Sequence, residues 1–539
     1  MESRSLPVRT ILVTIGLVFL AQPALAQSEA PDDDAAQEAA RFARAYAALE
    51  QNYMDDVDPD QVILEGGIRG MLSALDPFSS FFNPDQFKML QDQARGQALG
   101  FGSVLFVQPG KIVVLQTAEG SPSWRAGLGP GDEIVSVNGT RIVELDFNSL
   151  VELLQRSRSQ PVTLGVIHPG KFVSEDIKLV PAEVALPTVD RSFLLASGIA
   201  YVHVSGFEGK TPQEVTDALT RLGNKGLKGI LLDLRDNHGG LVDAAVATTS
   251  LFLKPDQVTL TVKGRIAPEQ VQRTFQMPAH FDAPLIVLVN EDTASAAEIF
   301  AAAIEEHDRG LVVGQTTFGK GLVQSVMPLS EKCGLALTTA QYFTASGRSI
   351  QRPLPGTALT AEVNSVSAAS PAAPVSAMRP AAFVTGTAAR FHTDVGRPVS
   401  AGGGIVPDVP IPDRELDPWV TFVNQRGFFS SYASEYLTLH GKVTESFEPD
   451  SKILGDFKDF LSRQGIRTPE EYWSRDEDYL RLRIRAELLN LVFGLAAGDE
   501  VEVKGDPQVE RALFLFDKIP FLLKAPGLKT GTASVETAK

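Results

Sequence analysis

Apolar residues at helical spacing mark both ends of the chain. Phe42, Tyr46 and Leu49 recur at intervals of three to four residues, which is the period of one face of a helix. The same period predicts further helices over residues 62–75, 84–93, 453–463, 479–493 and 509–517. We therefore expect an N-terminal helical region over residues 27–95 and a C-terminal helical region over residues 415–524.

The middle of the chain alternates between strands and helices. Residues 229–234 (GILLDL) and 284–289 are almost wholly apolar, as is typical of strands that are covered on both faces. Further strands are expected over residues 199–204, 311–313 and 335–343, and helices over residues 212–222, 241–253 and 295–306. This alternation predicts a parallel or mixed sheet with helices on its faces. We expect the core to span residues 182–414, with a short linker at 182–188 and a surface insertion, rich in Ala, Ser, Pro and Val, at 358–387.

A strand-rich module precedes this core. Strands are expected over residues 103–107, 111–115, 134–137 and 162–167, with a helix over 148–156. A Gly-rich loop with free backbone N–H groups can hold a peptide's C-terminal carboxylate, and an adjacent strand edge can add the peptide as a strand. Glycines alone would fit a plain turn equally well. With the run SPSWRAGLGPGDEIVSVNG that begins at Ser121, residues 96–181 closely resemble a bacterial, circularly permuted PDZ domain, which implies peptide binding at Gly100, Phe101 and Gly102.

Composition narrows the functional classes. A chain of 539 residues is too long for one compact core, and its 44 % hydrophobic and 21 % charged content is that of a folded protein. The net charge of −17 argues against nucleic acid as a partner, because phosphate binding needs concentrated positive charge. The single cysteine, Cys333, excludes an intrachain disulfide.

The first 26 residues have the parts of a signal peptide. Arg4 and Arg9 precede an apolar stretch at residues 10–20, and Ala24-Leu25-Ala26 has the small-x-small cleavage pattern. The apolar stretch is short for a membrane span, although an uncleaved anchor stays open. We expect export to the periplasm without stable membrane insertion after cleavage, and a polar tail at residues 525–539.

Ser295 begins a predicted helix, and two interpretations compete there. Ser295 and Glu298 fit a capping box, in which Ser accepts from the amide of the third helical residue and Glu reaches back. The first amides of a helix also lack intrahelical partners and carry the positive end of its dipole. The Ala296 amide would therefore suit one half of an oxyanion hole for a carbonyl that Ser295 attacks.

A nucleophilic serine needs a base, and Lys320 is the stronger candidate. It follows a buried strand between Gly319 and Gly321, and desolvation among apolar neighbours would lower its pKa so that it can act as a neutral amine. Gln324, four residues on, could hold the amine in place. Of the seven histidines, only His238 is expected at a strand end near the site, where it is a rival base.

Other chemistries have less support. The run GQTTFGKG at residues 314–321 nearly matches a phosphate-binding loop, but Gly321 replaces the Ser or Thr that would hold Mg²⁺. The sequence has no HExxH motif and no cysteine cluster, so we expect neither a metal nor another cofactor.

Several motifs together resemble the C-terminal processing peptidases, also called tail-specific proteases. They are TASAAEI from Thr293, VVGQTTFGKGLVQ from Val312, DLRDNHGG from Asp233, TTAQYFTASGRSIQ from Thr338 and GGGIVPDV from Gly402. The resemblance implies a multidomain α/β protein whose crotonase-like (ClpP/crotonase-type) core carries an inserted PDZ domain. It also implies Ser295 as nucleophile, Lys320 as base and Gln324 as its positioner, with an oxyanion hole formed by the Ala296 amide and a glycine amide.

That glycine would be Gly239 or Gly240. The family usually has serine where Thr293 and Ala297 stand, and proline or a small residue where His238 stands, which leaves a modulating role for His238 open. The expected function is a serine endopeptidase that cleaves exported proteins near apolar C-terminal tails. The alternatives are an inactive PDZ-containing binding or adaptor protein and a different hydrolase or isomerase on the same fold. A homo-oligomer or an adaptor protein as partner stays open.

Overall fold

The computed structural model describes residues 33–94, 97–108, 110–158, 160–185, 187–195, 198–223, 226–266, 268–329, 333–354, 391–467 and 470–524. The expected signal peptide, the insertion at 358–387 and the tail at 525–539 lie outside these residues. Among the helices described, none is both long and apolar enough to cross a membrane.

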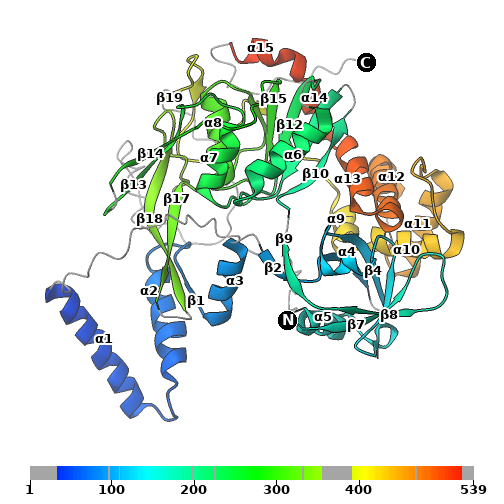
Figure 1. Ribbon diagram of the computed structural model, residues 1–539, viewed down its shortest axis with the longest axis horizontal. Helices are drawn as coiled ribbons and strands as arrows, with labels where there is room; N and C mark the ends of the chain where they lie inside the picture. The colour runs from blue at the N-terminus through cyan, green and yellow to red at the C-terminus, as the bar shows by residue number, and fades with distance from the viewer. Residues whose placement is uncertain are drawn as a thin grey trace.

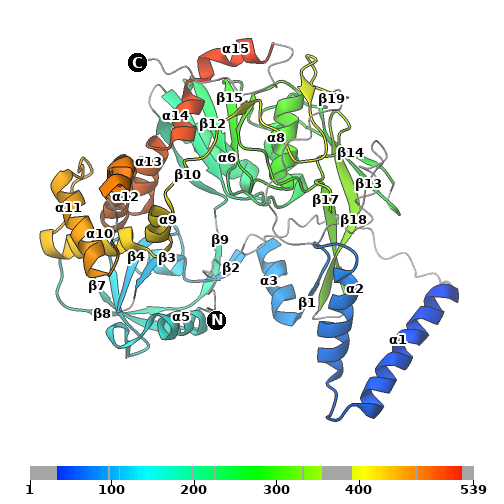
Figure 2. The same cartoon turned by 180° about the vertical axis from the view of Figure 1, so that it is seen from behind.

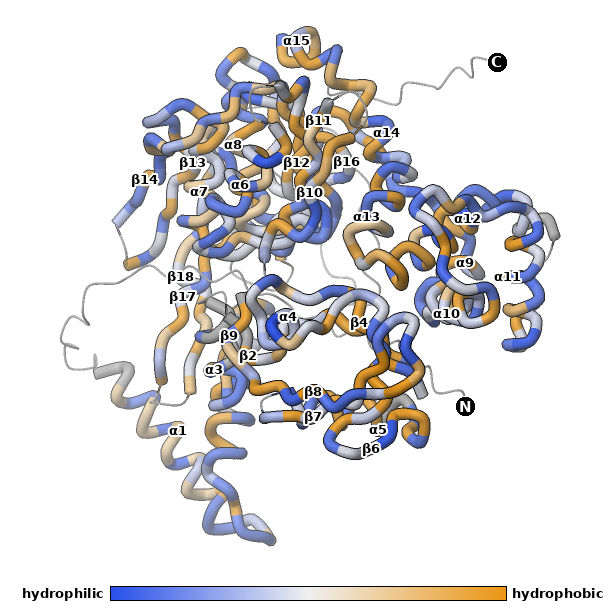
Figure 3. The backbone as a smooth tube through the Cα atoms, turned by 45° about the vertical axis from the view of Figure 1, so that its right-hand side comes forward, coloured by the Kyte–Doolittle hydropathy of each residue, from blue (hydrophilic) through white to orange (hydrophobic). Residues whose placement is uncertain are grey.

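A six-stranded sheet forms the centre of the protein (Figure 1). Its strand order is β10–β11–β12–β15–β16–β21, and all neighbours pair in parallel except β10 with β11. The bounds are Val189–Leu195 (β10), Ile199–Val204 (β11), Gly229–Asp233 (β12), Leu285–Val289 (β15), Leu311–Gly314 (β16) and Val409–Pro410 (β21). The predicted mixed sheet with buried strands is thereby confirmed, and the strands β12 and β16, labelled in Figure 3, are buried along their whole length.

Helices cover both faces of this sheet. Alternate residues of each strand point to opposite faces, so neighbouring residues pack into different cores. Val202 of β11 belongs to a core formed with α6 (Thr211–Gly223), α7 (Val242–Ser250) and α8 (Ala296–Glu306). The neighbouring Tyr201 belongs to a second core, which contains residues of the C-terminal helices α13 (Leu495–Lys504), α14 (Pro507–Leu513) and α15 (Ile519–Leu522). The end of the C-terminal helical region therefore completes the core (Figure 2).

A second sheet joins the N-terminal region to the core. Its order is β1–β18–β13–β14, and β17 also pairs with β18. The bounds are Ser80–Phe82 (β1), Val258–Gly264 (β13), Gln270–Arg273 (β14), Leu322–Pro328 (β17) and Gly334–Thr344 (β18). Only β18 was expected from the sequence. The N-terminal region is therefore not purely helical, since β1 belongs to a sheet whose other strands come from the core.

The N-terminal helices are α1 (Asp33–Asn52), a π-helix (Asp60–Ile68) that continues into α2 (Arg69–Ser73), and α3 (Pro84–Ala94). They confirm the helices expected there. In Figures 1 and 2, α1 projects away from the rest of the protein, and α15 lies at the opposite end.

The strand-rich module forms a separate sheet of order β3–β4–β5–β7–β8, with β6 paired to β5. Its elements are β3 (Ser103–Gln108), β4 (Lys111–Thr117), α4 (Pro122–Arg125), β5 (Glu133–Val137), β6 (Thr140–Arg141), α5 (Phe147–Ser157), β7 (Val162–Ile167) and β8 (Glu175–Leu179). At its base, β2 (Gln97–Gly100) pairs with β9 (Ala182–Ala185). The expected linker at 182–188 is thus wrong in part, because four of its residues form a strand with the segment that enters the module.

The remaining C-terminal helices are α9 (Pro418–Gln425), α10 (Phe428–His440), α11 (Ser451–Arg463) and α12 (Glu470–Phe493). They share one hydrophobic core, to which Val113 of β4 also belongs. Lys111 of the same strand donates to Ser434 Oγ at 2.8 Å. The C-terminal region therefore contacts the strand-rich module as well as the central sheet.

Candidate active site

Ser295 lies between the end of β15 and the start of α8, where the chain turns sharply. Its backbone has φ 55° and ψ −117°, a conformation that L-residues rarely adopt. Such strain costs about 1–3 kcal/mol and persists only where the surroundings impose it. The side chain is nearly buried, with the residue 5 % exposed. A serine that only caps a helix at the surface needs none of this strain. The local geometry therefore indicates a role for Ser295 in addition to capping.

The glycine loop after β12 packs directly against this serine. A Cβ added to Gly239, which has φ +100°, would lie 2.8 Å from Ser295 Cβ and 2.9 Å from the Ala296 nitrogen. Only glycine allows the two backbones to come so close. The structure therefore brings the backbones of Gly239, Ser295 and Ala296 close together.

Asn237, which the sequence interpretation missed, fixes this loop. Its Oδ1 accepts from the Gly239 amide at 2.9 Å, its Nδ2 donates to the Val204 carbonyl at 2.7 Å, and its own carbonyl accepts from the Ala294 amide at 2.9 Å. Of the two candidate glycine amides, that of Gly239 is consequently already engaged. Gly240 lies next to it, bridged to Phe207.

Glu298 joins the serine and lysine segments. Its Oε2 accepts from the Ser295 amide at 2.9 Å, which is the glutamate half of the predicted capping box, and from the Lys320 amide at 2.9 Å. Its Oε1 accepts from the Gly319 amide at 2.8 Å and from the Thr317 hydroxyl at 2.5 Å. Burial raises the pKa of this fully buried carboxyl, and these four donors oppose the rise.

Lys320 is buried beside this carboxylate, and the residue is 7 % exposed. Burial lowers the pKa of its amine to about 8, against the opposing attraction of Glu298 and Asp76. Tyr342 of β18 ties the two candidate residues together, because its hydroxyl donates to the Lys320 carbonyl at 2.7 Å and contacts the Ser295 carbonyl oxygen at 3.1 Å. An amine in this environment can lose its proton near neutral pH, as a general base must.

Gln324 is fully buried in β17, four residues after Lys320, where the strand has a register shift. Its Nε2 donates weakly to Thr338 Oγ1 at 3.4 Å, and its Oε1 has no hydrogen-bond partner among the described residues. A buried acceptor without a partner is costly. The atom is therefore available to accept a hydrogen bond from an amine.

Of the described histidines, neither His238 nor His307 has a hydrogen bond to Ser295. His238 is exposed, and its Nδ1 lies 3.2 Å from the Asp292 carbonyl oxygen. His307 is held by Asp394 at 2.8 Å and by the Val258 carbonyl at 2.8 Å. Within the part of the chain that the structure describes, no group of three or more His, Cys, Asp and Glu residues could hold a metal ion.

The predicted peptide-binding loop leads into β3, a strand at the edge of its sheet. The Phe101 carbonyl accepts from the Ser123 amide at 3.0 Å, and the Gly102 carbonyl accepts from the Ala118 amide at 2.8 Å. Gly102 has φ +75°, and a Cβ there would lie 2.3 Å from Ser121 Cβ. The loop is therefore a fixed turn that needs glycine, next to an edge to which an extended peptide could add.

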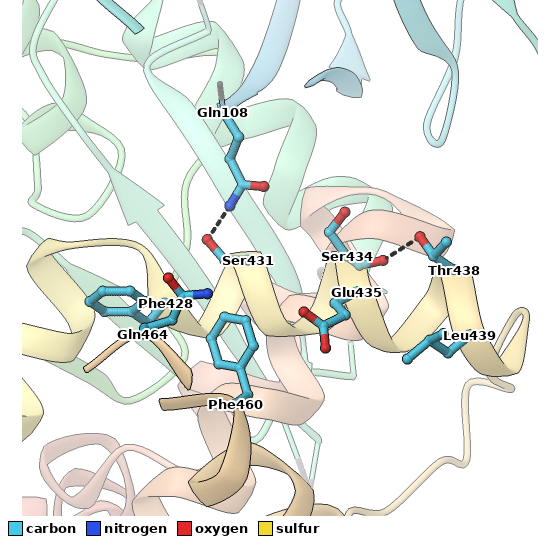
Figure 4. Close-up of a pocket in the computed structure, with 9 residues that line it drawn as sticks. All are labelled: Gln108, Phe428, Ser431, Ser434, Glu435, Thr438, Leu439, Phe460 and Gln464. Carbon is cyan, nitrogen blue, oxygen red and sulfur yellow. Dashed lines mark hydrogen bonds between the residues drawn. The ribbon is translucent and has the colours of Figure 1, made fainter. Parts of the chain in front are cut away.

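A cavity of about 590 Å³ lies away from these residues, between Gln108 at the end of β3 and the helices α10 and α11 (Figure 4). The side-chain amide of Gln108 donates to Ser431 there. None of the predicted site residues lines it.

Comparison with known families matches three parts of the chain. Residues 198–363 match peptidase family S41, residues 113–167 match a PDZ domain, and residues 19–86 match the N-terminal domain of the activating protease CtpB. Ser295, Lys320 and Gln324 all fall within the peptidase match.

Named relatives agree with these matches. The carboxy-terminal-processing protease of Bartonella bacilliformis is 32 % identical over 346 residues, which cover 63 % of this chain and 78 % of the relative. The carboxy-terminal processing protease CtpB of Bacillus subtilis is 31 % identical over 336 residues, which cover 62 % of this chain and 69 % of the relative. A solved structure of a photosystem II D1 C-terminal processing protease is 27 % identical and has a TM-score of 0.33. The match covers 58 % of this chain and 90 % of that one. The chain belongs to the carboxy-terminal processing proteases of peptidase family S41.

Proposed function

We propose that the protein cleaves exported proteins near apolar C-terminal tails, with Ser295 as nucleophile, Lys320 as general base and Gln324 as the acceptor that positions the lysine. The observation that carries this assignment is the Glu298 carboxylate, which accepts from the amides of both Ser295 and Lys320. One buried group thereby holds a strained serine and a desolvated lysine at a fixed separation.

In acylation, the neutral Lys320 amine takes the proton from Ser295 Oγ while that oxygen attacks the scissile carbonyl. The resulting oxyanion is stabilised by the Ala296 amide and the Gly240 amide, since the Gly239 amide already donates to Asn237. The intermediate then collapses, the C–N bond breaks, and the lysine ammonium gives its proton to the leaving amine. In deacylation, a water molecule loses a proton to Lys320 and attacks the ester, and Ser295 regains its proton.

The proposal extends to the architecture. We infer a signal peptide at 1–26, a helical region at 27–95, a PDZ domain at 96–181, a crotonase-like core at 182–414, a helical region at 415–524 and a tail at 525–539, in a periplasmic protein. The signal pattern of the first 26 residues supports export. The mainly parallel sheet with helices on both faces supports such a core. An inactive adaptor is disfavoured, because it would not require a buried lysine beside a strained serine.

Activity on a short peptide is expected to rise with pH through about 8, the pKa of Lys320 in this site. Below that pH the amine is protonated and cannot accept the serine proton, so kcat/KM should fall about tenfold per pH unit. Measuring kcat/KM between about pH 5 and pH 9.5 tests this. A flat profile down to about pH 5 would rule out a lysine base.

The glycine loop offers a test of substrate capture. Gly102→Ala forces a Cβ into Ser121, so binding of an apolar tail should weaken and KM for a tailed protein substrate should rise about tenfold or more. A short peptide without a tail should be cleaved as before. Gly110→Ala is the matched control, since Gly110 has a similar φ of +77° but its added Cβ has no neighbour closer than 3.7 Å. Equal losses on both substrates would remove the capture role.

A further inference from the structure

A segment from the N-terminal region reaches the lysine. After α2, residues 76–82 (DPFSSFF) turn into β1, which pairs with β18 in the register Ser80↔Ala336. The ring of Phe78 lies over Lys320, with its centroid 4.9 Å from Nζ. Phe78 is itself half-buried. The surroundings of the proposed base are therefore built partly by a segment that precedes the PDZ domain in the chain.

The turn that carries Phe78 is held by Asp76. Asp76 Oδ1 accepts from the amides of Phe78 and Ser79, both at 2.8 Å, and Oδ2 accepts from the Ser79 hydroxyl at 2.8 Å. Asp76 is 6 % exposed. An aspartate that bonds to the backbone two and three residues onward fixes a turn, so the ring of Phe78 is presented from a rigid base.

The same turn is connected to Gln324. Ser79 Oγ accepts from the Thr338 amide at 3.2 Å, and Thr338 Oγ1 accepts from Gln324 Nε2 at 3.4 Å. The turn is thus fixed both to β18 and, through Thr338, to the residue proposed to position the lysine. A surface loop without a structural role would make neither contact.

The ring has two opposite effects on the amine. Its π face favours the charged form of the amine, whereas excluding water disfavours that form and lowers the pKa. Burial is the largest influence on the pKa of Lys320. The charged groups that face the amine, Glu298 on α8 and Asp76 in this turn, both favour the ammonium, and the Tyr342 hydroxyl on β18 donates to the lysine carbonyl. Because the pKa of Lys320 is lowered overall and the ring lies over the amine, we expect the ring to act mainly by covering it.

We propose that Phe78 is a positioning residue for catalysis: held by the Asp76 turn, its ring covers one side of the Lys320 amine and keeps water from that side. This inference rests on the proposed role of Lys320 as the base. It makes the N-terminal region part of the active site, because the core alone would leave that side of the amine uncovered.

The test is the pH dependence of kcat/KM on a short peptide for Phe78 variants of the full chain. Phe78→Ala should move the acidic limb to higher pH by about one unit, which is about a tenfold loss at neutral pH that recovers at alkaline pH, with KM unchanged. Phe78→Leu still covers the Lys320 amine but has no π face, and Phe78→Tyr keeps both. Both variants should keep the acidic limb near that of wild type. If Phe78→Ala does not fold, Phe78→Gln leaves a smaller gap than alanine while its polar amide admits water, and it should give the same shift.

Phe82→Ala is the matched control. Phe82 lies in β1 and packs against the cluster of Phe87 and Leu90, so its loss should lower the unfolding midpoint without moving the limb. An unmoved limb in Phe78→Ala, or a Phe78→Leu limb displaced as far as that of Phe78→Ala, would overturn the proposal. Lys320→Ala separates the two claims: if it is inactive while Phe78→Ala leaves the limb in place, only the role of Phe78 is wrong, and if it stays active, the base assignment itself is wrong.

Discussion

Replacing Ser295 with alanine should lower kcat by a factor of roughly 10⁵ to 10⁶, because the step that forms the acyl-enzyme is lost. Lys320→Ala should cost nearly as much, since the serine hydroxyl then has no base. The two losses should not add: a double variant should be about as inactive as either single one, as for residues that act as a unit. Steady-state kinetics on a short peptide measures all three.

Ser325→Ala is a suitable control for this series. Ser325 lies one residue after Gln324 on β17, and its hydroxyl pairs with Thr339 at 2.7 Å. Its loss should leave kcat within a few-fold of wild type. If Ser295→Ala kept more than about one per cent of the activity, the assigned nucleophile would be wrong, since nucleophile deletions remove far more.

Glu298→Ala should have the largest effect on stability. It leaves three backbone amides and the Thr317 hydroxyl without their acceptor in a fully buried site. At about 1–3 kcal/mol for each unsatisfied group, and allowing for partial relaxation, we expect a loss of at least about 3 kcal/mol in the free energy of unfolding. Activity should also collapse, because the serine and lysine segments are no longer held together. Urea unfolding and peptide hydrolysis measure the two effects.

Glu306→Gln separates stability from positioning. Glu306 lies at the other end of α8, where it binds Arg348 at 2.7 Å and the Ser346 amide at 2.6 Å. This substitution should destabilise the protein yet leave kcat of the folded enzyme unchanged. A Glu298→Ala variant with wild-type kcat would show that Glu298 serves only as a helix cap.

Long periodic elements were predictable from the sequence alone. The strand Ile199–Val204 has the expected bounds, and the helix Ala296–Glu306 starts one residue later than expected. Each element carries its own sequence pattern. A buried strand is almost wholly apolar, and capping-box residues mark the start of a helix. The nucleophile and base candidates were found because fixed motifs surround Ser295 and Lys320.

The contacts between distant segments were not predictable. The helix expected over residues 62–75 ends just before Asp76, and β1 is three residues long, too short to show a period. Glu298 was recognised as a capping residue, but nothing local shows that its carboxylate also reaches Gly319 and Lys320. Val113 likewise gives no sign that it packs into the core of the C-terminal helices. Such pairings are set by tertiary packing.

Labelling of Ser295 by a fluorophosphonate, which phosphonylates activated serines, tests the Ser-Lys assignment most directly. We expect one adduct, mapped by mass spectrometry to Ser295, whose rate of formation rises with pH around about 8, the pKa of Lys320, and is lost in Lys320→Ala. An adduct on another residue, or labelling of Ser295 at the same rate without Lys320, would contradict the assignment.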